Sequence, residues 1–491
     1  MTADDPSKAH QKITPSISNS TREKLSRLLA RVIFFSALVL IALTAIPYGS
    51  VEFWWTSFFE IGVFALTILW AVQALFGESY CWNRWSWLVL PGSALIIFCI
   101  IQAIPFNRGM VAGFANRIQY AVSADPFETR SFVFRLAAVL LLGILLLRFT
   151  TTRGRLHSLI LTVLGVGAAS AIFGILRQAV QQGESAFVLP ALLRGIGYAQ
   201  IISRNQFAFM MEIAFGLALG MIFQRGGRLE LSLLYLSLTL PIAAALILAN
   251  SRGGIFTMMC QVIFLAALVV PALLAGPRKE HAEDRGTQGR RLLYTIGTRV
   301  LLTCALFTVV IMGVIWVGGE RVVSNLSTVT AELKPEDDVA RWNTRRIDIW
   351  RATWTMIKDH PVVGVGFGGY FTAIPHYHDA SGAYTPQQAH NDYLEILASG
   401  GVIGLAIFIW FAIVLLKRLR KRMQEANSFG RVACLGALTG LVGVAVHSTF
   451  DFGLHLTING ALCVALIVIG TAEIQGGNRP VNLRGSIGDL Q

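Results

Sequence analysis

The stretch SGGVIGLAIFIWFAIVLL-KRLRKR, residues 399–422, decides the class of this protein. Its first eighteen residues contain no charged side chain, and five of the next six are basic. A run of about 20 apolar residues is long enough to cross the hydrocarbon core of a bilayer as a helix. Lys and Arg beside such a span mark its cytoplasmic end. The stretch therefore predicts a transmembrane helix whose carboxyl end faces the cytoplasm.

The whole chain has the composition that this stretch implies. Of its 491 residues, 54% are hydrophobic and only 14% are charged, and the mean hydropathy is +0.60. Soluble chains carry about 25% charged residues, so a set of water-facing domains is excluded. The net charge of +13 is expected to mark cytoplasmic loops. Patterns typical of nucleic-acid binding are absent, so no nucleic-acid partner is expected.

Twelve apolar runs predict an all-α polytopic membrane protein with about 12 transmembrane helices. The predicted spans are 30–48, 57–76, 87–105, 131–149, 157–179, 203–223, 231–249, 253–275, 299–318, 399–416, 432–450 and 455–474. The predicted organisation is a cytoplasmic amino-terminal segment (1–29), helices one to nine (30–318), one large outer loop (319–398), helices ten to twelve (399–474) and a cytoplasmic tail (475–491). The loop of eighty residues is polar and contains Trp and Pro, which predicts a folded extramembrane element.

Charge and cysteine usage add an orientation. If the amino-terminal end is cytoplasmic, the cytoplasmic segments carry 26 of the 41 Lys and Arg, as the positive-inside rule requires. No cleaved signal peptide is expected, because the first twenty residues contain no apolar run. The six cysteines form no CxxC pair, so neither a disulfide framework nor a cysteine metal site is expected. The polar tails 1–20 and 476–491 are predicted to be disordered.

Two predicted helices begin with an arginine on the outer face, at Ser203-Arg204-Asn205 and Ser251-Arg252-Gly253. A cation is disfavoured at a helix start, so this placement indicates an anionic ligand that meets both the guanidinium and the backbone N–H groups. The alternative is an interfacial arginine that reaches lipid headgroups.

One carboxylate, Glu212, falls inside a predicted span. An intramembrane carboxylate is costly and is either functional or paired, so it is a candidate site residue or the partner of an arginine such as Arg177. Arg135, near the outer end of the fourth span, is a further candidate contact for an anion.

The large loop has the densest pattern. Trp350, Trp354 and Ile357 lie at helical spacing, which predicts an amphipathic helix over 345–358 on or near the membrane; a solvated basic face is the alternative. The glycines of 364–369 predict a tight turn, and no strand–helix unit around them supports a Rossmann fold. His376-Tyr377-His378-Asp379 lacks further ligands at suitable spacing, so no metal is expected.

The segment Gln388-Ala389-His390-Asn391-Asp392-Tyr393-Leu394-Glu395 leads into the tenth span. A histidine side chain can gain or lose a proton near neutral pH, so His390 suits proton transfer to or from a hydroxyl. Asp392 or Glu395 is its expected orienting partner. Binding of an anion or positioning of an acceptor by His390 are the alternatives.

Together these residues resemble the O-antigen ligase and polymerase superfamily of bacterial envelope glycan assembly. The resemblance covers roughly 200–410 and rests on Arg204-Asn205, Ser251-Arg252-Gly253, Arg346-x-x-x-Trp350, Asp359-His360-Pro361, Gly364-x-Gly366-x-Gly368, and Ala389 to Glu395 with Gly400, Gly401 and Gly404.

The resemblance implies a helical bundle like that of C-type glycosyltransferases (GT-C-like) in the bacterial inner membrane, with the large loop and the active site on the periplasmic side. It implies a transferase that needs no metal or cofactor and moves glycan from an undecaprenyl-diphosphate-linked oligosaccharide to a sugar hydroxyl. The family's essential residues correspond to Arg252, Arg346 and His390. Residues expected to contact the diphosphate or glycan are Arg204, Asn205, Arg345, Trp350, Arg351, Asn391 and Glu395.

The acceptor is less well determined. His447-Ser448-Thr449-Phe450-Asp451-Phe452 resembles an element of polymerase-like members, which favours a surface polysaccharide (O-antigen or exopolysaccharide) polymerase that uses a second lipid-linked repeat. The alternatives are a ligase acting on lipid A–core or, less favoured, transfer to protein. His447 and Asp451 are further candidate site residues, or a hydrogen-bonded pair that closes a hairpin. Chain-length regulators or flippases are expected partners. A lipid-linked oligosaccharide transporter is the competing class, but the two halves show no internal repeat.

Overall fold

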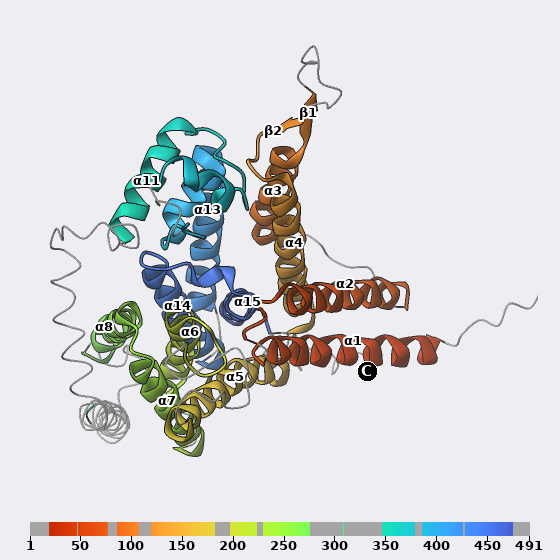
Figure 1. Cartoon of the computed structure of the whole chain (residues 1–491). Helices are drawn as coiled ribbons and strands as arrows, with labels where there is room; N and C mark the ends of the chain where they lie inside the picture. The colour runs from red at the N-terminus through yellow and green to blue at the C-terminus, as the bar shows by residue number, and fades with distance from the viewer. Residues whose placement is uncertain are drawn as a thin grey trace, which may run out of the picture.

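The computed structural model describes residues 19–46, 48–76, 86–107, 119–181, 197–222, 229–274, 308, 346–378, 385–425 and 428–474. These ranges are predominantly helical (Figure 1). A short antiparallel ribbon pairs β1 (Pro105–Asn107) with β2 (Gln119–Ala121). The helices are α1 (Asn19–Thr44), α2 (Phe53–Phe76), α3 (Ser86–Ala103), α4 (Pro126–Phe149), α5 (Arg153–Val180), α6 (Arg204–Ile222), α7 (Leu229–Leu248), α8 (Arg252–Leu274), α11 (Arg346–Asp359), α12 (Tyr370–Ala373), η2 (Ile374–His376), α13 (Asp392–Glu425), α14 (Ser428–His447), η3 (Gly453–His455) and α15 (Thr457–Thr471).

The helices confirm an all-α polytopic membrane protein. Within the described ranges, eight helices are long and apolar enough to cross a membrane, and the apolar segments of α3, α8 and α15 are shorter. Eleven of the twelve predicted spans coincide with these helices. The ninth, 299–318, lies almost wholly outside the described residues, as do nearly all of the two tails, so the total of twelve stays a prediction.

Several predicted boundaries move, and α1 begins at Asn19 and not at residue 30. The shift that bears on the site is in the tenth helix, α13, which begins at Asp392 and not at residue 399. Its first turn is capped by the Asn391 side chain, whose oxygen accepts from the Leu394 N–H at 3.0 Å. Gly401 has non-helical angles, with φ at 59°, and puts a kink into the helix. The predicted span therefore began at the kink and missed two turns that lie before it.

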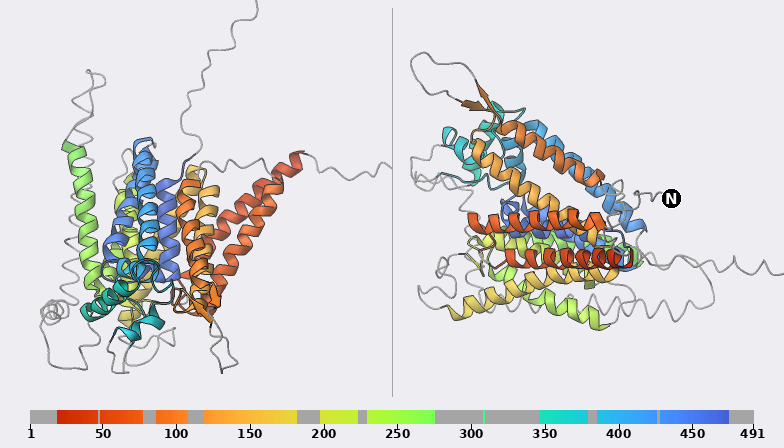
Figure 2. Two further views of the ribbon diagram at one scale, coloured as in Figure 1. Left: turned by 90° about the horizontal axis from the view of Figure 1, so that it is seen from above. Right: turned by 90° about the vertical axis from the view of Figure 1, so that its right-hand side faces the viewer.

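The helices run alternately up and down between two ends of the bundle (Figure 2). At one end the Thr457 hydroxyl donates to the Ser50 carbonyl at 3.0 Å, joining the start of α15 to the α1–α2 connection. At the other end Arg22 donates to the Leu75 carbonyl, joining the start of α1 to the end of α2. We call the first end, where α6, α8 and α13 begin and α14 ends, the site end.

Small residues bring α6 and α14 into close contact at the centre of the bundle. A Cβ added at Gly216 would lie 2.5 Å from the Gly440 nitrogen, and one added at Gly220 would lie 2.2 Å from the Gly436 Cα. The two helices thus pair through a Gly-x-x-x-Gly motif on each side, the usual way for membrane helices to approach closely. Gln261 of α8 fastens both by donating to backbone carbonyls of each helix. This contact ties α6, α8 and α14 together inside the bundle.

The described part of the large loop folds against the site end, where α11 packs beside α13 (Figure 1). Its turn fits only glycine at several positions. Gly366 has φ at 94°, and a Cβ there would lie 2.3 Å from the Ser123 hydroxyl. The Ala124 N–H donates to the Val365 carbonyl at 2.8 Å. The predicted tight turn is confirmed, and it docks the loop onto the segment before α4.

The predicted amphipathic helix is confirmed as α11, but one residue of its predicted apolar face is misplaced. Ile357 is buried and Trp350 is partly buried, whereas Trp354 is 48% exposed. Packing against Tyr370 and Ile374 buries Met356 beside Ile357 instead. A buried hydrogen bond between the Thr353 and Tyr370 hydroxyls, 2.7 Å long, fixes that choice.

Candidate functional site

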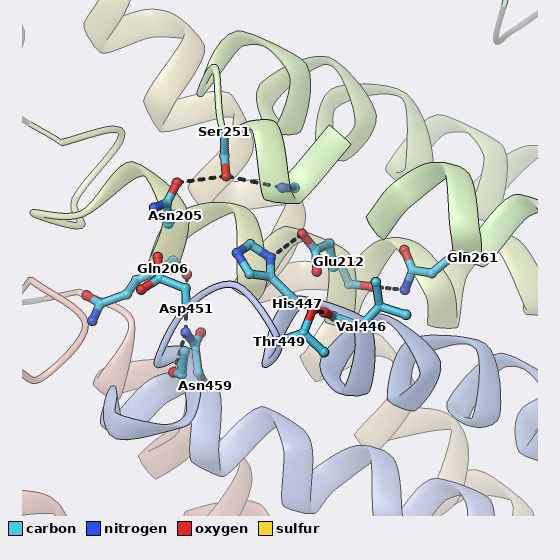
Figure 3. A network of polar contacts seen from close by, with 12 residues as sticks. Asn205, Gln206, Glu212, Ser251, Gln261, Val446, His447, Thr449, Asp451 and Asn459 are labelled. Atoms are coloured by element: carbon cyan, nitrogen blue, oxygen red, sulfur yellow. Dashed lines mark hydrogen bonds and ion pairs between the residues drawn. The ribbon is translucent and has the colours of Figure 1, made fainter. Parts of the chain in front are cut away.

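The polar groups of the site end converge on the connection between α14 and α15. We call residues 447–456 the 447–456 turn. Its side chains meet α6 through His447, α13 through Ser448 and His455, and α11 through Asp451. Figure 3 shows His447 directed at Glu212, with Asp451 nearby on the same turn. Segments far apart in sequence are therefore tied to one short element.

Asp451 joins the two loop residues predicted to be essential. Its Oδ1 lies 3.0 Å from His390 Nδ1, and its Oδ2 lies 3.8 Å from an Arg346 guanidinium nitrogen. The Asp451 side chain is only 2% exposed, while His390 is 25% and Arg346 41% exposed. A buried carboxylate thus anchors an imidazole and a guanidinium that still reach the surface.

The charge of Asp451 is stabilised in place. Burial favours the neutral acid, but the hydrogen bond from His390 and the charge of Arg346 outweigh it, so the pKa of Asp451 lies below its usual value. The Phe452 N–H adds a hydrogen bond to the same oxygen at 3.0 Å. An ionised Asp451 requires the proton of His390 to be on Nδ1, which leaves Nε2 as a proton acceptor.

The orienting partner of His390 was predicted wrongly. Asp392 accepts from the Ser448 hydroxyl at 2.7 Å, and Glu395 accepts from the Ala389 N–H at 2.9 Å. Both carboxylates are close to His390 in sequence but are engaged elsewhere. His390 has φ at 50°, a left-handed conformation that is unusual for a residue other than glycine, and this turns its ring toward Asp451.

Glu212 is paired inside the bundle, as one alternative predicted, but not with arginine. Its Oε1 lies 2.7 Å from His447 Nδ1, and both side chains are 1% exposed (Figure 3). Arg177 instead donates to the Gln181 side chain and to the Ala199 carbonyl. The alternative of a hydrogen-bonded pair between His447 and Asp451 is confirmed through the backbone, since the Asp451 N–H donates to the His447 carbonyl at 3.1 Å.

The starts of α6 and α8 lie side by side, as the shared outer face predicted. The Ser251 hydroxyl donates to the Asn205 side chain at 2.8 Å and accepts from the Gly254 N–H at 3.2 Å (Figure 3). Arg204 and Arg252, the first residues of these helices, are both exposed. A Cβ at Gly253 would lie 3.3 Å from His447 Nε2, so α8 begins directly against the 447–456 turn.

Three residues predicted to bind substrate make structural contacts. Trp350 Nε1 donates to the Ala389 carbonyl at 3.0 Å. Asn391 caps α13 and donates to the Thr449 carbonyl at 3.1 Å. Arg351 is exposed and lies 3.5 Å from Asp348.

Two other candidates are Arg135, whose charge acts on His455 of the 447–456 turn, and Arg345. Arg135 of α4 is partly buried, and its Nε has no hydrogen-bond partner. Arg345 lies outside the described residues. In the described part of the chain, no three His, Cys, Asp or Glu side chains are grouped to hold a metal ion. Whether the reaction needs a metal is untested, and so its independence of metal stays a prediction.

Fold and site define a multi-pass membrane protein with a cationic, histidine-containing site at one end of its helices. Residues 237–409 match the family described as O-antigen ligase. This match confirms the resemblance to the O-antigen ligase and polymerase superfamily over these residues and indicates a glycan-handling, glycosyltransferase-like function. No curated protein matches the chain. The matched region contains Arg252, Arg346 and His390, whereas the 447–456 turn lies beyond it.

Sequence reasoning missed the role of this turn. Asp451 was a candidate only through its resemblance to polymerase-like members, and Ser448 and His455 had no assigned role. Their spacing gave no signal, because their partners on α11 and α13 lie far away in the sequence. An acidic residue between two spans on the same predicted face as His390 was the one available hint.

Proposed function

We propose that the protein is a glycosyltransferase that moves glycan from an undecaprenyl-diphosphate-linked donor to a sugar hydroxyl, as a polymerase of surface polysaccharide. The observation that carries the proposal is the grouping of His390, Asp451 and Arg346 beside the arginine-led starts of α6 and α8. The site supplies one proton acceptor and several cations, which is what this transfer needs.

His390 is the proposed base. With Asp451 on Nδ1, its Nε2 accepts the proton of the acceptor hydroxyl as that oxygen attacks the anomeric carbon of the donor. The bond from that carbon to the diphosphate oxygen breaks, and the electron pair leaves with the lipid diphosphate. A single displacement of this kind inverts the anomeric centre.

The arginines are proposed to stabilise the leaving group. Negative charge grows on the diphosphate as the bond breaks, and preorganised guanidinium groups lower that barrier. Arg252 and Arg204 begin neighbouring helices, and Arg346 faces the same turn through Asp451. Guanidinium suits this role because it binds phosphate oxygens bidentately.

The orientation follows from charge. The basic run after residue 416 lies toward the end opposite to the site, since α13 begins at the site end. We infer that the site end faces the periplasm and that both termini are in the cytoplasm of a bacterial inner membrane. Chain-length regulators and flippases remain proposed partners.

Ligation to lipid A–core is the second candidate, because the matched family is described as O-antigen ligase. Purified protein is supplied with lipid-linked repeats alone and then with lipid A–core added. A ladder of products without the added acceptor supports the polymerase. Products that require lipid A–core support the ligase. Movement of the lipid-linked repeat across a vesicle membrane without bond formation would show a transporter instead.

The site assignment is tested in the same assay. Arg252→Ala, Arg346→Ala and His390→Ala should each abolish transfer at normal membrane levels. Arg130→Ala is the matched control, since Arg130 is an exposed arginine of α4 near the same end. If all three variants kept the glycan length and amount of the unaltered protein, the site would lie elsewhere.

A further inference from the structure

The backbone of Ala389, the residue before His390, is held at both its N–H and its carbonyl. The Ala389 N–H donates to Glu395 Oε2 at 2.9 Å, and the Ala389 carbonyl accepts from Trp350 Nε1 at 3.0 Å. Ala389 itself is fully buried. The next residue, His390, is in the left-handed region with φ at 50°. A conformation of this kind persists in a side-chain-bearing residue only where the surroundings impose it.

Glu395 is in turn held by the 447–456 turn. Its Oε1 lies 3.1 Å from His455 Nε2, and the Gln388 amide donates to the same carboxylate. Both oxygens of Glu395 are thus engaged within the protein, and its side chain is 8% exposed. This argues against the predicted contact of Glu395 with the glycan.

His455 faces a defined set of groups. Besides Glu395, Asp392 of α13 places an oxygen 4.0 Å away, and the Phe452 ring packs edge-on at 5.9 Å between centroids. Arg135 of α4 is the cation that acts on it. His455 stands four residues after Asp451 on the same turn. The Glu395–His455 contact therefore links the backbone beside His390 to the turn that carries Asp451, the carboxylate that orients the His390 ring.

We propose that Glu395 and His455 form a positioning pair that sets the His390 ring against Asp451. The proposal rests on the proposed function, in which His390 is the base. Neither residue touches substrate in this role. Their contribution is geometric, since a displacement of about 1 Å at a reacting group is enough to lower a rate by about 10²-fold.

The test compares purified variants in nanodiscs, with lipid-linked oligosaccharide isolated from a strain that lacks this protein. Glu395→Ala should lower kcat by about 10²-fold and change KM by less than about threefold, because donor binding is untouched. Glu395→Gln keeps an oxygen for the Ala389 N–H and should restore kcat to within about tenfold of the unaltered protein. The control, Glu128→Ala, removes an exposed carboxylate near the same end and should have no effect.

Two kinetic results would overturn the positioning role. A rise in KM that Glu395→Gln does not restore would show that Glu395 binds substrate, and a Glu395→Ala enzyme equal to Glu128→Ala would show that the contact is idle. If Glu395→Ala is not recovered from membranes, His455→Ala replaces it, with an expected kcat loss of about tenfold. Hydrogen exchange at the Ala389 amide should be faster in Glu395→Ala and in His455→Ala. Unchanged exchange in these variants would also refute the proposal.

A double variant separates this proposal from the function beneath it. If Glu395 acts only through His390, the His390→Ala/Glu395→Ala enzyme should be no slower than His390→Ala alone. A further loss of about 10²-fold would show that Glu395 acts independently. Full activity of His390→Ala would refute the assigned base whatever Glu395 does. A dead His390→Ala enzyme beside a fully active Glu395→Ala enzyme would refute the positioning pair alone.

Discussion

Replacing Asp451 by Asn tests the centre of the site most directly. The substitution keeps the size of the side chain and removes its charge. In the structure the carboxylate is 2% exposed and lies 3.0 Å from His390 Nδ1. The contact is therefore shielded from solvent. An amide at this position can donate to Nδ1, which would move the imidazole proton to Nε2 and remove the proton acceptor.

The expected magnitude follows from two contributions. A hydrogen bond to a charged group contributes about 1.5–3 kcal/mol, and each 1.36 kcal/mol changes a rate about tenfold. Loss of the bond alone therefore lowers kcat by about 10–150-fold. A reversed tautomer adds to this, as in the serine-protease triad, where the equivalent change costs about 10⁴-fold. Stability should change little through Arg346, because that side chain is 41% exposed and its ion pair is screened.

The assay is transfer by purified protein in nanodiscs, with kcat measured at saturating lipid-linked donor. Asp348→Asn is the matched control, because Asp348 lies on α11 and pairs with Arg351 rather than with His390. We expect a kcat loss of at least about 10²-fold for Asp451→Asn. A variant within threefold of the unaltered enzyme would refute the role of Asp451 in orienting the base.

Three further predictions concern packing and charge. Gly220→Ala should destabilise the protein by about 1–3 kcal/mol, because its Cβ would lie 2.2 Å from Gly436; Gly165→Ala, with open space around it, should raise the melting temperature slightly. Glu212→Ala should cost about 3 kcal/mol by leaving His447 buried without its partner, measured as a lower melting temperature, and an unchanged value would contradict the pairing. Burial lowers the pKa of His455, but the Glu395 charge outweighs this effect, so the pKa of His455 is raised. The stability that the protonated His455 adds is complete below the ordinary histidine pKa and should be lost as pH rises through the raised pKa. The melting temperatures of the unaltered protein and of His455→Gln should therefore converge toward alkaline pH.

Much of the architecture was predictable from local sequence. Apolar runs gave eleven helices that the structure contains, and the arginines at the starts of α6 and α8 were placed on one face before any contact was known. Helix capping and a kink at Gly401 moved the start of α13, because hydropathy measures membrane burial and not where a helix begins. The exposure of Trp354 was missed for a similar reason, since the periodicity of α11 fits two adjacent stripes and packing chooses between them.

For the site, too, sequence and tertiary structure decide different features. The sequence alone predicted site roles for His390, Arg252 and Arg346 through the family resemblance, and it placed them at one end of the helices, because residue type, order and span alternation are local properties. Only the tertiary structure decided which carboxylate orients His390. Asp392 and Glu395 are two and five residues away from it but point to Ser448 and Ala389, whereas Asp451 is 61 residues away and lies at 3.0 Å. The physical reason is that the close packing of α6 against α14 sets where the 447–456 turn lies, and no spacing along the chain encodes that distance.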